Sequence, residues 1–593
     1  MIDFDIILKH IGGLGRFQII LIFLVGYYSI PAGINSLAPV FINYTPAFRC
    51  SVPQFDTNPY YTNLTENEIL NLTTPLDKNG EYDTCYRQRN KRVFHSSFCA
   101  KVTKIYDYNA SYCIEGSLDC VNKSAAKIPC DQGYHYDRSI FPETVITEFD
   151  LVCDNKYLDA LATSLYMIGV LLGSLIFGNI SDRFGRKITM IVTSVLCFAG
   201  LLGCAFVHNF TLFVVSRVFV AFFGFGTFIS NFVYLLEITS NKWRTLLGVS
   251  FQLGFAIGYM ILSGVAYQWS NWHDMEIAMS IVSVPYALFL FFIPESPRWL
   301  FSNGREEEAK KITRRFAKYN KVTLDEPDIW NEADTDTSQV SDVTRDVISD
   351  NKLYHEYNIT FIKKTKKRLL PRFVNSMVYY GISLNAGALA GDIFVNNALN
   401  GVMEIAAYVI VIAFMDITGR RFMLTAMLVL ASASLICSTI KYILNSVYYI
   451  TGLITLGVVF AFAAKVGISG SYAVVYNFTS ELYPTVVRNR TNGVGVGSTF
   501  ARFGSILAPF ILALQAYLKW LPNVIFGVAA AAAALLSYTL PETKGIDMME
   551  TIEEAERFYN GKTIKNQLVL TEKNDVGYEY TNGQFDHKES IAK

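Results

Sequence analysis

The stretch GNISDRFGRK at residues 178–187 follows one long apolar segment, and DITGRR at residues 416–421 follows another. Further along each half, an acidic residue precedes an arginine by seven positions, as in Glu237–Arg244 and Glu481–Arg488. A third pair of motifs closes each half, PESPR at residues 294–298 and PETKG at residues 541–545. Three signals in the same order indicate a duplicated six-helix unit, as in transporters built from two parallel repeats.

Apolar segments long enough to cross a bilayer lie around these motifs, since a span needs about 20 mostly apolar residues. The sequence predicts twelve spans, at residues 17–41, 157–180, 188–207, 210–236, 246–267, 275–293, 373–391, 398–415, 422–443, 449–478, 492–515 and 520–540. Asp3 and Asp5 argue against a cleavable signal peptide, so the first span is expected to be retained. The predicted fold class is therefore an all-α polytopic membrane protein of twelve transmembrane helices in two pseudo-symmetric halves.

The composition excludes several other classes of protein. Of the 593 residues, 51% are hydrophobic and only 17% are charged, against about 25% charged in soluble domains. The 51 Lys and Arg residues balance the 51 Asp and Glu residues, so a nucleic-acid partner is not expected. No P-loop, nucleophile elbow or metal-spaced histidines are found in the sequence, so we expect neither an enzyme nor a metal site.

The segment at residues 42–155 carries the features of an extracellular loop. It holds seven of the ten cysteines, namely Cys50, Cys85, Cys99, Cys113, Cys120, Cys130 and Cys153. It also holds candidate glycosylation acceptors at Asn63, Asn71, Asn109 and Asn122, together with a membrane-proximal one at Asn43. Cysteines clustered with such acceptors indicate an oxidising compartment, whereas the lack of a C-x-x-C pair disfavours a reduced metal site. Seven cysteines predict three disulfides and one spare thiol, with the connectivity open.

Basic residues lie at the opposite ends of the predicted spans, which places both termini in the cytoplasm of a plasma-membrane protein. The expected organisation is an N-terminal half at residues 1–300 that includes the loop 42–155, a cytoplasmic central loop at 301–366, a C-terminal half at 367–545 and a cytoplasmic tail at 546–593.

The repeated charged motifs predict a conformational latch, because their carboxylates can pair with nearby arginines. The candidate residues are Asp182, Arg183, Gly185, Arg186, Glu237, Arg244, Asp416, Gly419, Arg420, Glu481 and Arg488. Such pairs would hold the cytoplasmic helix ends together and break when the site opens inward. The alternative is that the basic residues are ordinary membrane anchors, although anchoring would not need the repeated acids.

Together these motifs resemble the organic cation/anion/zwitterion transporter family of the major facilitator superfamily. The resemblance also rests on GRFQ at residues 15–18, the cysteine-rich first loop, PESPRWL at 294–300 and ELYPTVVRN at 481–489. It implies transport of small organic ions by alternating access, without a bound cofactor, coupled to Na⁺ or H⁺. We expect the bilayer and the substrate to be its partners, and a monomer to be the working unit.

Charged residues at membrane depth are costly and usually functional, so they bear on the substrate. Arg502 lies mid-span in the eleventh segment, and Lys465 is similarly deep in the tenth. The alternatives are structural pairing for Arg502 and an ion pair with Glu404 for Lys465. The resemblance implies that cation carriers have an acid where Arg502 stands, whereas carriers of anions and of carnitine-like zwitterions have arginine.

Aromatic residues complete the predicted substrate site, because tyrosine rings attract ammonium groups and also pack against flat apolar anions. The candidates are Tyr234, Tyr259, Tyr379, Tyr380, Tyr472 and Tyr476, each of which could instead serve packing alone. With Arg502 they suit an organic zwitterion or anion. A polyspecific organic cation carrier is the first alternative, and a non-transporting receptor a remote one.

Overall fold

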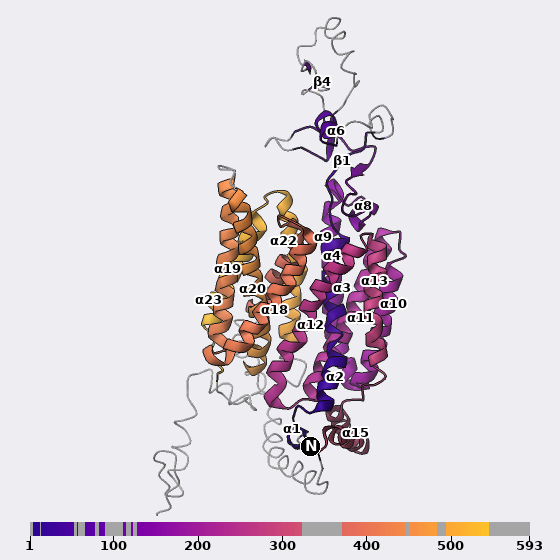
Figure 1. Cartoon of the computed structure of the whole chain (residues 1–593), viewed down its shortest axis with the longest axis vertical. Coiled ribbons are helices and arrows are strands. Elements are labelled where there is room, and N and C mark those ends of the chain that lie inside the picture. The colour runs from indigo at the N-terminus through magenta and orange to yellow at the C-terminus, as the bar shows by residue number, and fades with distance from the viewer. Residues whose placement is uncertain are drawn as a thin grey trace, which may run out of the picture.

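We describe the fold from a computed structural model of the chain. The structure describes residues 4–11, 13–52, 56, 66–76, 82–88, 111–113, 120–122, 127–322, 370–445, 451–482 and 494–544. Two groups of long helices stand side by side in Figure 1, with the N-terminal group in indigo to magenta and the C-terminal group in orange to yellow. This two-group arrangement agrees with the duplication that the sequence predicts.

The N-terminal group occupies the first six predicted spans. Its helices are α2 (Arg16–Gly26), α3 (Ser29–Leu37), α4 (Pro39–Ile42), α9 (Lys156–Phe184), α10 (Arg186–Cys204), α11 (Phe210–Glu237), α12 (Asn241–Gln268) and α13 (Trp272–Phe289). The first span is thus three short helices in succession rather than one. Pro39 stands at the first position of α4, where its missing N–H leaves no helical hydrogen bond unmade.

The C-terminal group occupies the other six predicted spans. Its helices are residues 370–384 with η3 (Asn385–Ala388), α18 (Ile393–Thr418), α19 (Arg420–Asn445), α20 (Thr451–Leu482), α22 (Val494–Ala513) with η4 (Leu514–Ala516), and α23 (Leu521–Tyr538). Three further helices, α1 (Phe4–His10), α14 (Pro297–Ser302) and α15 (Glu306–Asn320), lie at one end of the bundle. We call this end the α15 side.

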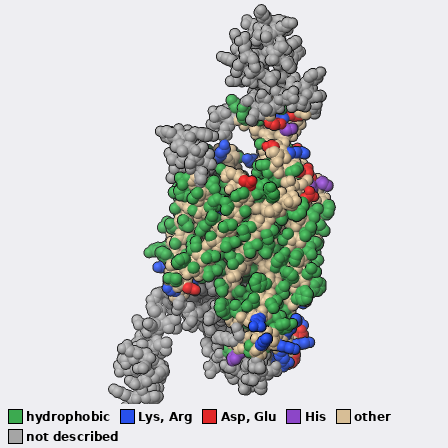
Figure 2. Space-filling model, in the orientation of Figure 1, with side chains coloured by type: hydrophobic (Ala, Val, Ile, Leu, Met, Phe, Trp, Pro, Cys, Tyr) green, Lys and Arg blue, Asp and Glu red, His purple; other side chains and the backbone are tan. Residues whose placement is uncertain are grey.

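A membrane setting fits the surface of these helices. In the described part of the chain, ten helices, counting α2 to α4 as one, are long and apolar enough to cross a bilayer. The remaining two predicted spans are α13, which carries Asp274 and Glu276, and the shorter helix at residues 370–384. On the face shown in Figure 2, apolar side chains form a broad band across the middle of the molecule, and charged ones gather toward its two ends.

The segment after α4 extends above the bundle, and its C-terminal part packs against the N-terminal helices (Figure 1). Its described elements are β1 (Phe48–Cys50), α6 (Glu66–Thr73), β2 (Tyr86–Gln88), β3 (Ser111–Cys113), β4 (Cys120–Asn122), β5 (Lys127–Pro129), β6 (Tyr134–Tyr136), α8 (Val145–Glu148) and η2 (Cys153–Asn155). The strands pair antiparallel as β1–β6, β2–β5 and β3–β4. We call this end of the molecule the loop side.

Two disulfides join distant parts of this loop, Cys50–Cys130 and Cys85–Cys153, which confirms that it is disulfide-bonded. Cys113 and Cys120 are backbone partners in the β3–β4 pair, but their side chains lie outside the described set, as does all of Cys99. The predicted acceptors Asn63 and Asn109 also lie outside it, and only the backbone is described for Asn71 and Asn122. Glycosylation therefore stays a prediction, as do the domain limits that fall in residues 323–369 and the tail after 544.

The two groups of helices contact each other on the loop side. The α9 helix packs along α22, where the Ser164 hydroxyl donates to the Ile506 carbonyl at 2.9 Å. The α12 helix packs along α18, where Asn397 donates to the Tyr259 carbonyl at 3.1 Å. Phe394, at the start of α18, stacks on Phe41 of the N-terminal group. These contacts close the bundle on the loop side.

Candidate functional site

A cavity lies between the two groups of helices, where the sequence predicts a substrate site. It has a volume of about 960 Å³ counting its opening, and both groups line it. The N-terminal group contributes Tyr28, Ala32, Asn35, Ser36, Tyr166, Val170, Cys197, Val220, Ala221, Gly224, Phe225, Phe228, Phe232, Phe251, Gln252 and Phe255. The C-terminal group contributes Tyr379, Tyr380, Tyr408, Tyr472 and Arg502.

Arg502 is the charged residue of this cavity, and the described lining contains no Asp or Glu. Its side chain comes from α22 and is only 3% exposed, with the guanidinium carbon 4.3 Å from the centre of the Phe225 ring. A guanidinium over an aromatic face is attracted by cation–π interaction, and arginine is the residue type that commonly binds carboxylates. The structure thus brings the predicted Arg502 to the interface of the two groups.

Aromatic rings make up most of the remaining wall. Of the predicted tyrosines, Tyr379, Tyr380 and Tyr472 line the cavity. Our reading of the sequence missed Tyr28, Tyr166, Tyr408 and the phenylalanines. Tyr408 could have been found from the sequence, because it lies one helical turn after the intramembrane Glu404. In the structure its hydroxyl donates to the Glu404 carboxylate at 2.6 Å.

Two polar lining residues add hydrogen-bond acceptors. The side-chain carbonyl oxygens of Asn35 and Gln252 are buried and accept no hydrogen bond from the described residues. A buried acceptor left without a donor is costly, so such groups usually serve a ligand or water. The cavity therefore combines one cation, two carbonyl acceptors and a wall of aromatic rings.

Lys465 lies behind this wall and pairs with Glu404. The two side chains are fully buried, with Nζ 2.8 Å from the Glu404 carboxylate. Lys465 also donates to the hydroxyls of Tyr259 and Ser383, and Tyr379 donates to Glu404 at 2.9 Å. Because Tyr379 lines the cavity, this buried pair supports the wall from outside. The sequence suggested that Lys465 contacts the substrate directly, and this stays a prediction. The structure does show the alternative, an ion pair between Lys465 and Glu404.

The other predicted tyrosines lie elsewhere. Tyr259 packs on Lys465, with the ammonium 4.6 Å from its ring centre. The Tyr234 hydroxyl donates to the Pro294 carbonyl at 3.0 Å, near the α15 side and apart from the cavity lining. The side chain of Tyr476 lies outside the described set. Hydropathy alone could not separate these roles, because all of the tyrosines stand in similarly apolar helices.

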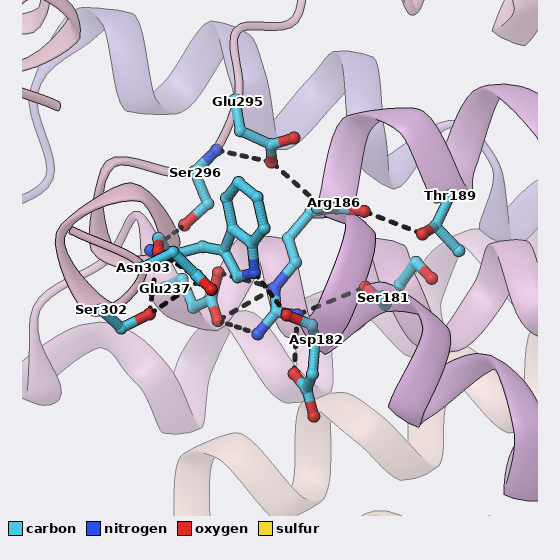
Figure 3. A network of polar contacts seen from close by, with 12 residues as sticks. Ser181, Asp182, Arg186, Thr189, Glu237, Glu295, Ser296, Ser302 and Asn303 are labelled. Carbon is cyan, nitrogen blue, oxygen red and sulfur yellow. Dashed lines mark hydrogen bonds and ion pairs between the residues drawn. The ribbon is translucent and has the colours of Figure 1, made fainter. Parts of the chain in front are cut away.

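The predicted latch of the N-terminal group forms a compact network on the α15 side (Figure 3). Arg186 lies 2.6 Å from Asp182 and 2.7 Å from Glu237, which joins α9, α10 and α11. Glu295 accepts the backbone N–H groups of Arg186 and Lys187 at the start of α10. Burial raises the pKa of the Glu295 carboxyl above its ordinary value, and these hydrogen bonds oppose the rise.

The C-terminal group repeats part of this network. Arg420 lies 3.0 Å from Asp416, and Glu542 accepts the backbone N–H groups of Arg420 and Arg421. Glu295 and Glu542 therefore have the same role at the start of α10 and α19, which the sequence analysis did not assign to either. A carboxylate at this position is stabilised by the helix dipole.

Other latch residues differ from the prediction. Arg183 is exposed and lies over the Phe184 ring instead of joining the network. Arg488 and the side chains of Arg244 and Glu481 lie outside the described set. The contacts above all lie within one group of helices, so they brace each group internally. The role of the network as a latch between conformations stays a prediction.

Glycine is required at the turn in both networks. Gly185 has φ +105° and ψ 156°, and Gly419 has φ +91° and ψ 158°, a region that essentially only glycine adopts. A side chain at Gly185 would also place its Cβ 2.6 Å from Glu295.

We predict that Gly185→Ala lowers the amount of protein at the cell surface and its melting temperature, since the backbone strain alone costs about 1–3 kcal/mol. Gly178→Ala, where a Cβ would meet nothing within 4 Å, is the matched control. Equal melting temperatures for the two variants in a fluorescence-detected stability assay would contradict the prediction.

Comparison with known proteins identifies the class. A family model described as "Sugar (and other) transporter" matches residues 94–555. A solved structure of the major facilitator superfamily proton:xylose symporter XylE superposes with a TM-score of 0.52 at 16% identity, over 93% of this chain and 99% of that one. The helices and the central cavity therefore form a major facilitator transporter fold.

Similar proteins identify the family of the chain within this superfamily. Human "Solute carrier family 22 member 16" is 34% identical over 98% of this chain and 97% of that protein. Human "Organic cation/carnitine transporter 2" is 33% identical over 93% and 94%, and the Drosophila melanogaster "Organic cation transporter protein" is 31% identical over 94% and 95%. This chain belongs to the solute carrier 22 family of major facilitator transporters. It is a multi-pass membrane transporter and not an enzyme.

Proposed function

We propose that this transporter carries small organic zwitterions of the carnitine type, or organic anions, across the plasma membrane by alternating access. The observation that supports the proposal is a cavity between the two helix groups that contains Arg502, has no described acidic lining residue and is walled by aromatic rings. Arginine binds a carboxylate in a two-pronged geometry, and aromatic faces attract a quaternary ammonium group.

The positions of Arg502 and of the aromatic rings suggest how a substrate would lie in the cavity. The carboxylate would lie at Arg502 of the C-terminal group, and the ammonium among the aromatic rings that both groups contribute. A substrate that contacts both groups at once can favour the closed form of the carrier, as alternating access requires. Asn35 and Gln252 would accept hydrogen bonds from the substrate or hold a coupling cation.

We further propose that the chain acts as a monomer with both termini in the cytoplasm, driven by a Na⁺ or H⁺ gradient. The basic helix ends on the α15 side favour this orientation. The names of the carnitine-transporting relatives favour the substrate class.

Uptake by cells that express the chain tests the substrate proposal. We expect saturable uptake of labelled carnitine, a betaine or an aryl carboxylate, measured with and without a sodium gradient and at two external pH values. Loss of uptake when one gradient is removed would identify the coupling ion. Absence of uptake for all three compounds, with the protein present at the cell surface, would refute the proposal.

A polyspecific organic cation carrier is the second candidate, because the tyrosines and phenylalanines of the cavity would also suit a bare ammonium ion. Saturable uptake of tetraethylammonium that exceeds the uptake of every carboxylate would favour this candidate. The position of Arg502 in the lining argues against it, since a guanidinium among the described lining residues repels a cation, and none of those residues is an Asp or Glu that would attract one.

A further inference from the structure

Three metal-ligand side chains from separate elements meet on the loop side, apart from the substrate cavity. Glu148 ends α8, His208 lies in the turn between α10 and α11, and His273 is the second residue of α13. Their ligand atoms all lie within 4.8 Å of one another. No metal site is predicted from the sequence, because His208 and His273 lie 60 and 125 positions from Glu148 and follow no motif spacing.

His273 is held as a metal-binding histidine usually is. Its Nδ1 lies 2.7 Å from the Ala205 carbonyl, and its Nε2 lies 3.0 Å from the Glu148 carboxylate. A neutral imidazole has a single N–H, so it cannot donate to both oxygens. If Nδ1 donates to Ala205, the Nε2 lone pair faces a carboxylate, and a cation between them removes the repulsion. Donation of one ring N–H to a backbone carbonyl is the common second contact of a metal-ligating histidine.

The carboxylate is oriented by a second donor. The Trp272 indole N–H donates to Glu148 at 2.7 Å, and its ring packs on the His273 ring with centres 3.8 Å apart. Glu148 and His273 are only 15% and 16% exposed, so the protein fixes both of them. His208 is 77% exposed, with its Nδ1 3.3 Å from Glu148, and can turn toward a metal at little cost.

The spacing suits a small transition-metal ion. Zinc binds histidine nitrogen and carboxylate oxygen at about 2.0–2.2 Å in a tetrahedral arrangement, which separates neighbouring ligand atoms by about 3.3 Å. His273 Nε2 lies 3.0 Å from Oε2 of Glu148, and His208 Nδ1 lies 3.3 Å from Oε1, so each imidazole is at ligand spacing from one of the two carboxylate oxygens. Two imidazoles with one carboxylate favour Zn²⁺ over Ca²⁺ or Mg²⁺, which prefer oxygen ligands.

We propose that Glu148, His208 and His273 form a Zn²⁺ site with water in the fourth position. The ion would fasten the end of the loop at residues 42–155 to the α10–α11 turn and to α13. All three ligands belong to the N-terminal half, so the site would stabilise the base of the loop without opposing movement between the two groups of helices.

Metal titration of the purified full-length protein tests this proposal. After chelator treatment and dialysis, Co²⁺ added as a spectroscopic probe should give tetrahedral absorption bands that saturate at one equivalent, and Zn²⁺ should displace it. His208→Ala should weaken binding by about 10- to 100-fold, and its exposed side chain makes misfolding of this variant a minor concern. His135→Ala is the matched control, because His135 is a partly exposed histidine on the loop side that also lies near a glutamate, 3.8 Å from Glu66, outside the proposed site.

Zn²⁺ should also raise the melting temperature of the wild type and of His135→Ala, but not of His208→Ala. Absence of saturable binding by the wild type would overturn the proposal. Equal binding by the wild type and His208→Ala would overturn it as well, because the ion would then lie elsewhere.

Discussion

Replacing Arg502 with alanine should lower the transport efficiency for carnitine or an aryl carboxylate by about 10- to 150-fold. A hydrogen bond to a charged partner contributes about 1.5–3 kcal/mol, and each 1.4 kcal/mol changes affinity tenfold. Arg502 is the charged residue among those described around the cavity, so no second cation of the described lining can replace it. The transport efficiency is obtained from initial uptake rates over a range of substrate concentrations, normalised to surface protein.

The conservative variant and a control make this test specific. Arg502→Lys keeps the charge but loses the planar fork, so we expect activity between those of the alanine variant and the wild type. Arg305→Ala removes a half-exposed arginine on the α15 side and should leave uptake unchanged. If Arg502→Ala reaches the surface and transports carboxylates at the wild-type rate, Arg502 is structural, and tetraethylammonium uptake becomes the decisive measurement.

The fold could be predicted from the sequence because its strongest signals are local. Long apolar segments must form helices in a bilayer, where every backbone polar group needs an internal partner. The repeated glycine and acidic motifs then revealed the duplication, and both glycines indeed adopt backbone that only glycine tolerates. The breaks within the first span were not predicted, because mean hydropathy does not register a local interruption such as the one at Tyr27 and Tyr28, where the backbone keeps right-handed helical angles.

The site was only partly predictable, because its function depends on contacts between distant segments. The position of Arg502 in the middle of a span was enough to predict a role in the cavity. Lys465 pairs with Glu404, whereas Arg502 lines the cavity. Which of these two cations has which role depends on how α18, α20 and α22 pack. The aromatic wall was underestimated for the same reason, since Phe225 and Tyr166 become lining residues only when the two groups meet.

The Glu404–Lys465 pair should have the largest effect on stability of any single contact described here. Both side chains are fully buried, and removal of one partner leaves an uncompensated charge, which costs about 3–5 kcal/mol. We therefore expect Glu404→Gln to reduce surface protein strongly and to lower the melting temperature. Lys465→Met should do the same, because the buried Glu404 would lose its cationic partner and, among the described residues, keep the hydroxyls of Tyr379 and Tyr408 as donors.

The double variant separates a structural pair from a substrate contact. Glu404→Gln combined with Lys465→Met leaves no buried charge at this position, so its melting temperature should exceed that of either single variant, and the coupling energy follows from the cycle. Glu308→Gln is the control, since its partner Arg305 is half exposed and such a pair contributes only about 0–1 kcal/mol. If the double variant folds and transports, the pair only supports the wall behind Tyr379. If it folds at the wild-type level but transports nothing, Lys465 or Glu404 also takes part in transport, as the sequence suggested for Lys465.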